Sequence, residues 1–166
     1  MNNKIAIQMD DIMTIDYAFD SSFMIGLEGQ KRNYEIFYYH PNDLYIDNGL
    51  VKARGFYIEL FEQDKNYFKF LSEKIEINLE EFKFIFLRQD PPFNMHYITS
   101  TYLLDCLSDT TIVINNPTSV RNCTEKILPF KFKEFMPPTL ISQNIKDIKI
   151  FLDIHKDVIT KPLYGN

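Results

Sequence analysis

The sequence has few of the residues on which disulfide-stabilised and metal-stabilised domains depend. Its 166 residues include two cysteines, Cys106 and Cys123, three histidines and no tryptophan. Two cysteines are too few for a disulfide framework, and no histidine stands near a cysteine at the spacing of metal ligands. These features are typical of a reducing compartment, so we expect a cytoplasmic protein with no metal site among these residues.

Long apolar runs and an excess of positive charge are missing as well. No stretch approaches the roughly 18 apolar residues that span a membrane, and the first residues lack the basic and apolar segments of a secretion signal. The 18 basic and 23 acidic side chains leave a net charge of -5. Because nucleic-acid binding requires a concentrated positive surface, we expect neither a nucleic acid nor a membrane as a partner.

Hydrophobic residues make up 45% of the chain, which is long enough to bury a core. Residues 4–9 form a short β-rich run, residues 20–22 offer N-cap side chains to a helical pattern, and residues 34–38 form a second β-rich run. A strand, a helix and a strand in this order begin a parallel sheet. The pattern therefore predicts an α/β fold.

Turn signals and hydrophobic periodicity divide the rest of the chain into further strands and helices. Strands are expected at residues 43–46, 50–60, 82–87, 110–114, 139–142 and 157–160, and helices at residues 95–107, 119–132 and 145–155. The continuous apolar runs at 82–87 and 110–114 predict buried strands. Cys106 lies on the apolar face of a predicted helix and is expected in the core.

The short motifs of many enzyme families are absent. The sequence has no glycine-rich dinucleotide fingerprint, P-loop, G-x-S-x-G, H-E-x-x-H or C-x-x-C. Polar segments instead follow the predicted strands, at residues 10–22, 88–93 and 115–126, with a further one at 161–166. Open α/β sheets bind their ligands at the carboxyl ends of the strands, so these segments are the candidate sites.

Five short motifs within these segments follow one another along essentially the whole chain. They are Met9-Asp10; Asp20-Ser21-Ser22-Phe23; Arg88 with Asp90-Pro91-Pro92-Phe93; Asn115, Pro117, Val120 and Arg121 followed by Glu125-Lys126; and Lys161-Pro162-Leu163 with Gly165. In order and spacing, the set resembles the N-terminal portion of prokaryotic glutathione synthetase, a family of the ATP-grasp superfamily. The chain departs from the family's pattern at Asp11, Gln89, Asn94 and Thr124, where the family has proline, lysine, aspartate and asparagine.

The resemblance implies a chain in two parts. Residues 1–122 would form a Rossmann-like, substrate-binding pre-ATP-grasp domain with a mostly parallel sheet. Residues 123–166 would form the first α+β elements of an ATP-grasp domain that is incomplete. We therefore expect a fragment that is inactive alone, with its Mg²⁺ ligands beyond residue 166.

The implied activity is that of glutathione synthase, an ATP-dependent amide ligase. In the family, γ-glutamylcysteine and glycine are joined through an acyl phosphate, which gives glutathione, ADP and phosphate. ATP and Mg²⁺ are the implied cofactors, and full-length family members are homotetramers. Two further readings remain open, namely another ATP-grasp carboxylate-amine ligase and a noncatalytic Rossmann-like binding module.

The resemblance also implies roles for individual residues. It assigns nucleotide binding to Lys126 and Lys161, together with Gly165 and Asn166 at the start of a glycine-rich loop, and it assigns substrate binding to Arg88, Asp90, Asp20, Ser21 and Ser22. No catalytic residue is expected, because such chemistry needs mainly positioning and charge neutralisation.

Structural explanations compete with several of these roles. Arg88 is alternatively interpreted as a surface residue at a rigid turn. Ser21 and Ser22 are alternatively interpreted as caps of the helix that follows them. Arg121 and Glu125 have the i, i+4 spacing of an ion pair on one helix. The Pro91-Pro92 segment is a candidate for a cis peptide bond.

Overall fold

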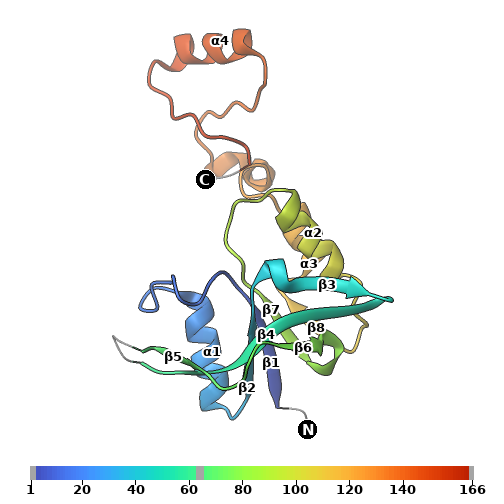
Figure 1. Ribbon diagram of the computed structural model, residues 1–166. Coiled ribbons are helices and arrows are strands. Elements are labelled where there is room, and N and C mark those ends of the chain that lie inside the picture. Colours follow the sequence, from blue (N-terminus) through green and yellow to red (C-terminus); the bar gives the residue numbers. More distant parts are fainter. Residues whose placement is uncertain (1–2, 63–65, 165–166) are drawn as a thin grey trace.

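A computed structural model describes residues 3–62 and 66–164 of the chain. Four strands form the parallel centre of its sheet: β1 (Lys4–Gln8), β2 (Glu35–Tyr39), β7 (Phe84–Leu87) and β8 (Ile112–Ile114). Strand β1 pairs with β2 on one side and with β7 on the other, and β8 continues the sheet beyond β7 (Figure 1). This arrangement confirms the expected Rossmann-like α/β class.

Helix α1 (Ser21–Lys31) connects β1 to β2 and covers one face of the sheet. Its first turn is closed by Asp20, whose Oδ1 accepts a hydrogen bond of 2.7 Å from the backbone N–H of Phe23. Alternate strand residues point to opposite faces, so Ile5 and Ile7 pack under α1 whereas Ala6 lies in the core on the other face. The predicted strand, helix and strand are thus confirmed.

An antiparallel portion extends the sheet beyond β2. The predicted hairpin of β3 (Leu44–Asp47) and β4 (Leu50–Leu60) is confirmed, with Gly49 at φ 81° in its turn. Strand β4 pairs with β2 at residues 56–58, and at the adjacent Gly55 a Cβ atom would lie 2.9 Å from Phe37 Cζ and closer still to the Tyr38 carbonyl oxygen. Glycine at this position therefore permits the close approach of the two strands.

Strand β4 also pairs with two short strands that the sequence analysis missed, β5 (Phe68–Phe70) and β6 (Ile75–Asn78). Strand β5 has no buried residue, and β6 has only Ile77, so segments this short show too little of a pattern to be recognised. Their register comes from the edge of the long strand β4 rather than from their own periodicity. Two 3-10 turns, η1 (Pro41–Asp43) and η2 (Leu79–Glu81), complete this portion.

The second face of the sheet is covered by α2 (Met95–Leu104), and α3 (Pro117–Asn122) packs beside α2. Leu104 of α2 joins a core that includes Phe37, Phe82 and Ile85. Cys106 lies beyond the end of α2 and is exposed, so its predicted core position is wrong. The predicted apolar face extended past the point at which the helix ends.

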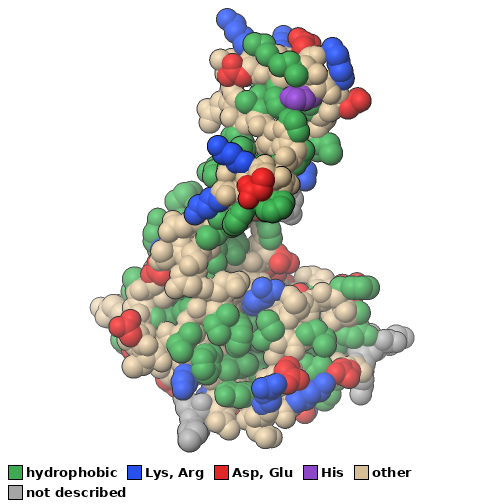
Figure 2. Space-filling model, turned by 180° about the vertical axis from the view of Figure 1, so that it is seen from behind, with side chains coloured by type: hydrophobic (Ala, Val, Ile, Leu, Met, Phe, Trp, Pro, Cys, Tyr) green, Lys and Arg blue, Asp and Glu red, His purple; other side chains and the backbone are tan. Residues whose placement is uncertain are grey.

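Residues beyond α3 form η3 (Leu128–Phe135) and α4 (Ile145–His155), and both views show them projecting from the α/β body (Figures 1 and 2). The strands predicted at 139–142 and 157–160 are wrong, because neither segment pairs with a strand in the described residues. Lys161 therefore does not end a strand. An apolar β-branched run becomes a strand only where a partner supplies its hydrogen bonds.

Strand β8 is formed but is not buried as predicted. Ile112 and Ile114 are 46% and 40% exposed, since β8 pairs with β7 alone among the described strands. Figure 2 shows hydrophobic side chains gathered on the rear face of the α/β body. Within the described residues, no helix has the length and apolar character needed to cross a membrane.

Candidate functional site

The loops that follow β1, β2 and β7 meet at the carboxyl ends of these parallel strands. Arg88 N donates to the carbonyl oxygen of Gln8 at 2.8 Å, and Asp90 N donates to Asp10 Oδ2 at 2.6 Å. A cavity of about 770 Å³ opens here, lined by His40 and Tyr97 as well as by Asp10 and Asp90. The expected location of the ligand site at this edge of the sheet thus coincides with a cavity.

The structure brings Arg88 together with both serines of the α1 first turn. Its Nη2 donates to Ser21 Oγ at 2.5 Å and its Nε donates to Ser22 Oγ at 3.3 Å. The N-cap of α1 is Asp20, so the serine hydroxyls are not the capping groups. Three of the predicted substrate-binding residues therefore form one hydrogen-bonded group, and Arg88 is half-buried rather than a free surface residue.

Acidic side chains give this edge of the sheet a negative character. Partial burial raises the pKa of the Asp90 carboxyl, and the nearby charges of Asp10 and Asp20 act in the same direction, whereas Arg88 opposes them. Burial also raises the pKa of Tyr97, on which Arg88 acts in the opposite direction. Close carboxylates of this kind favour a bound cation such as an ammonium group.

The Pro91–Pro92 peptide bond is cis, which confirms that expectation. Pro92 lines the cavity that contains Asp90, whereas Pro91 lines a second cavity of about 400 Å³. Tyr97 lines both cavities. The two cavities are therefore neighbours, with the proline turn and Tyr97 in their shared wall.

Lys126 lines the second cavity, beside Thr124 and Glu125 and opposite the proline turn. Lys161 lines a different cavity of about 430 Å³, whose wall includes Phe151 and His155 of α4. The structure therefore does not place the two predicted nucleotide-binding lysines in one cavity. Gly165 and Asn166 lie outside the described residues.

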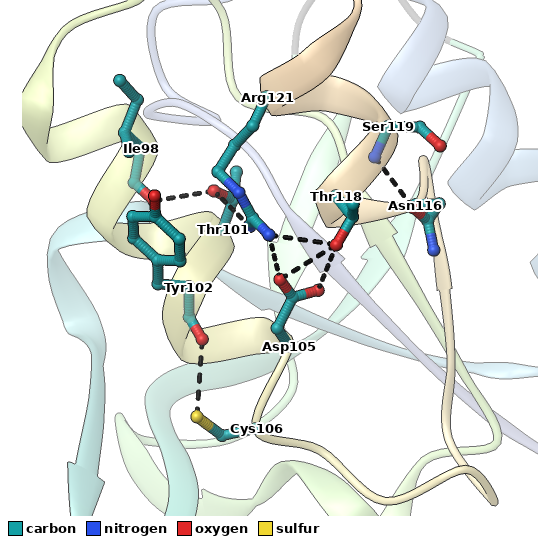
Figure 3. Close-up of polar contacts among 9 residues, drawn as sticks. All are labelled: Ile98, Thr101, Tyr102, Asp105, Cys106, Asn116, Thr118, Ser119 and Arg121. Carbon is teal, nitrogen blue, oxygen red and sulfur yellow. Dashed lines mark hydrogen bonds and ion pairs between the residues drawn. The ribbon is translucent and has the colours of Figure 1, made fainter.

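Arg121 has a different partner from the one that its spacing suggested. Its guanidinium pairs with Asp105 rather than with Glu125, and it also donates to Thr101 Oγ1 and Thr118 Oγ1 at 3.0 Å (Figure 3). The guanidinium carbon lies 4.3 Å from the centre of the Tyr102 ring. Arg121 lies on α3, and its partners Thr101, Tyr102 and Asp105 lie on α2 or at its end. These contacts therefore hold α3 against α2.

The family model described as prokaryotic glutathione synthetase, N-terminal domain, matches residues 3–121. The chain belongs to the prokaryotic glutathione synthetase family. A second model, described as prokaryotic glutathione synthetase, ATP-grasp domain, matches residues 125–166. The family that the sequence motifs resemble is thus confirmed over both segments.

Curated glutathione synthetases from several bacteria are similar to this chain. The protein of Mesorhizobium japonicum is 41% identical over 166 residues, which are 100% of this chain and 53% of that protein. The protein of Brucella melitensis is 42% identical over 98% of this chain and 52% of its own length, and that of Vibrio cholerae is 41% identical over 98% and 51%. The chain spans about half the length of the curated relatives it matches.

The sequence analysis missed several residues that line the cavity beside Asp90 in this family member. His40 follows β2 directly, and Tyr97 lies in the first turn of α2, the helix that follows β7. Both residues therefore lie near the carboxyl ends of strands, where ligand sites were expected. Gln89 was noted as a departure from the family pattern but was given no role. Its position between Arg88 and Asp90 was the available signal.

No group of three or more His, Cys, Asp or Glu side chains within residues 3–62 and 66–164 is arranged to hold a metal ion. The charges of Asp10 and Asp20 act on Asp90, but the three carboxylates do not form such a group.

Proposed function

We propose that this chain contributes the γ-glutamylcysteine-binding part of a glutathione synthase, which joins that dipeptide to glycine with ATP. The observation that carries the proposal is the pairing of Arg88 with Ser21 and Ser22 beside Asp90, at the carboxyl ends of β1 and β7 in a member of this family. Opposite charges lie side by side there, which suits a substrate that carries both an ammonium and carboxylates.

The proposed substrate contacts follow from the charges. Asp90, with Asp10 and Asp20 nearby, receives the α-ammonium of the γ-glutamyl group. Arg88 pairs with a carboxylate, for which its planar fork is suited, while Ser21 and Ser22 hold the guanidinium in place. These groups bind and orient the dipeptide, so its cysteinyl carboxylate is presented at a defined position for phosphorylation.

Nucleotide binding is proposed for Lys126 and Lys161, with Gly165 and Asn166 continuing from Lys161. The cavity beside Lys126 has a size typical of small-molecule sites, about 300–1,000 Å³, and combines one ammonium with apolar walls. Mg²⁺, held by residues other than those described, would neutralise phosphate charge when bound. The ammonium of Lys126 fits the role of a phosphate-binding point charge.

The domain division at residues 122 and 123 is part of the same proposal, as are a cytoplasmic location and a homotetrameric assembly. Neither a nucleic acid nor a membrane is proposed as a partner. The net charge of -5 is compatible with ATP, because a few placed lysines bind that anion without a basic surface.

An activity assay tests the proposal when the chain is joined to the segment that its relatives have beyond the matched half. We expect a fusion of residues 1–166 to the C-terminal half of the Mesorhizobium japonicum relative to condense γ-glutamylcysteine with glycine in the presence of ATP. Arg88→Ala should lower kcat/KM for the dipeptide by about 100-fold, because a charge-assisted bidentate contact is worth roughly 3 kcal/mol.

A Lys161→Ala fusion provides the background rate. Activity of the unsubstituted fusion no higher than that background would contradict the proposal. Titration of the chain with nucleotide and with γ-glutamylcysteine separates the competing readings, since another ATP-grasp ligase would bind the nucleotide alone and a noncatalytic module would bind neither.

A further inference from the structure

A buried hydrogen-bond network lies behind the cavity that contains Asp90. It consists of Gln8 at the end of β1, Gln89 after β7 and Ser100 of α2, which are 0%, 9% and 5% exposed. Gln8 Nε2 donates to Gln89 Oε1 at 2.5 Å. Ser100 Oγ lies 2.9 Å from the same oxygen and 2.8 Å from the carbonyl oxygen of Tyr97.

These bonds leave one end of the Gln89 amide for the cavity. Among the described residues, the buried side-chain atoms that lack a hydrogen-bond partner are Gln8 Oε1, Tyr39 OH and Tyr45 OH. No hydrogen bond from Gln89 Nε2 is found within residues 3–62 and 66–164, whereas its Oε1 is held by Gln8 and Ser100. Gln89 lines the cavity of about 770 Å³, and its Oε1 is turned toward Gln8 and Ser100, so we place the two N–H donors of Nε2 on the cavity side.

The charges on the cavity wall favour this orientation of the amide. Asp10 and Asp90 line the same cavity, and a carboxylate attracts an N–H group and repels a carbonyl oxygen. The amide is neutral, so it does not form an ion pair with these carboxylates as a lysine would. Its donors therefore stay available for an incoming anionic group.

We infer that Gln89 donates through Nε2 to the α-carboxylate of the γ-glutamyl group, next to the α-ammonium at Asp90. An amino-acid group carries both charges on one carbon atom, and consecutive residues here offer the matching acceptor and donor. Gln8 and Ser100 act as positioning residues, since they hold the amide from behind. The inference rests on the proposed function, because it assigns one group of the same dipeptide.

The test is titration of the ¹⁵N-labelled chain with γ-glutamylcysteine, followed by NMR. We expect the side-chain amide signals of Gln89, assigned by their loss in Gln89→Glu, to shift with the backbone signal of Asp90. Gln89→Glu keeps an acceptor for Gln8 and Ser100 but replaces the donor by a carboxylate oxygen. It should weaken binding by about tenfold or more, as expected when a hydrogen bond to a charged group is lost.

Two further measurements separate a ligand contact from a structural role. A ligand that lacks the α-carboxylate, 4-aminobutanoyl-cysteine, should bind Gln89→Glu and the unsubstituted chain within about twofold of each other. Ser100→Ala removes one of the two groups that position the amide but leaves the Gln89 donors in place, so it should weaken binding by less than about threefold.

Equal or tighter binding of γ-glutamylcysteine by Gln89→Glu would overturn the inference. That result would indicate that the residue 89 side chain accepts a hydrogen bond from the ligand ammonium, a role that a carboxylate fills better than an amide. A Gln89 side-chain signal that stays fixed while the Asp90 signal shifts would also overturn the inference. If no signal of the unsubstituted chain moves, the proposed function fails and the inference fails with it.

Discussion

Arg88 and Asp90 illustrate how neighbouring residues at the end of one strand acquire different partners. The guanidinium of Arg88 reaches back to the first turn of α1, whereas the backbone of Asp90 binds the Asp10 carboxylate after β1. Loops far apart in the sequence are thereby joined around one cavity. The Asp90 carboxyl itself lies among other acids, so its ionisation opposes folding.

Asp90→Asn should stabilise the chain in a pH-dependent manner. The pKa of Asp90 is raised above its ordinary value of 3.8, so its preferential protonation supports the folded state at low pH, and this support is lost as pH rises through the folded-state pKa. We expect the variant to gain up to about 1 kcal/mol at pH 7, a small value because the site is open to solvent. Urea titrations at several pH values measure the gain.

The gain should shrink towards zero below about pH 4, where aspartate is protonated in the unfolded chain as well. A gain that is the same at pH 3 and pH 7 would contradict this explanation. The same substitution should weaken γ-glutamylcysteine binding, which is a common trade between stability and function at binding sites.

At the scale of elements, α3 is too short to be stable by itself and depends on its contacts with α2. Asn116 caps α3 by accepting from Ser119 N at 2.9 Å, and Arg121 provides the main polar link to α2 (Figure 3). Ser119 and Val120 of α3 form part of the wall of the cavity beside Lys126. Both helices therefore contribute to the wall of that cavity, α2 through Tyr97 and α3 through Ser119 and Val120.

Arg121→Ala should destabilise the chain by about 2 kcal/mol, because charge-assisted hydrogen bonds and the stacking on Tyr102 are lost together. The matched control is Arg32→Ala. Arg32 pairs with Glu28 at i, i+4 on the exposed side of α1, and such pairs contribute only about 0.3–0.5 kcal/mol. Urea unfolding measures both variants, and equal losses would show that Arg121 contributes no more than a surface ion pair.

Elements were predictable where one segment carries its own pattern. The α1 cap at Asp20, the hairpin turn at Gly49 and the apolar strand β7 all depend on local residues, and all three are confirmed. β5 and β6 were missed because the edge of β4 determines them. The strands predicted at 139–142 and 157–160 are absent among the described elements, because these segments have a strand-like pattern but no neighbouring strand to pair with.

At the scale of the whole molecule, the α/β body and the projecting segment differ in burial. Strand β1 is buried and paired on both sides, whereas α4 has no buried residue and stands apart from the body in Figure 1. A helix of 11 residues is marginally stable by itself. The free energy of local unfolding should therefore be much lower for α4 than for the α/β body.

Hydrogen exchange should show this difference. We expect the amides of β1 and β2 to exchange only on global unfolding, and those of α4 to exchange through local opening that costs about 1 kcal/mol or less. Exchange followed by NMR at several urea concentrations measures both. Protection of α4 equal to that of β1 would show that the projecting segment is more tightly held than its burial indicates.

The sequence by itself determined the family and the α/β class and predicted the edge of the sheet that carries the candidate site, because motifs, periodicity and strand ends are local properties. It also named Arg88, Asp90, Ser21 and Ser22. Only the tertiary structure decided which of these groups meet, that Arg121 pairs with Asp105, and that Gln89 lines the cavity beside Asp90. Such contacts join residues far apart in the chain, so they depend on how the elements pack.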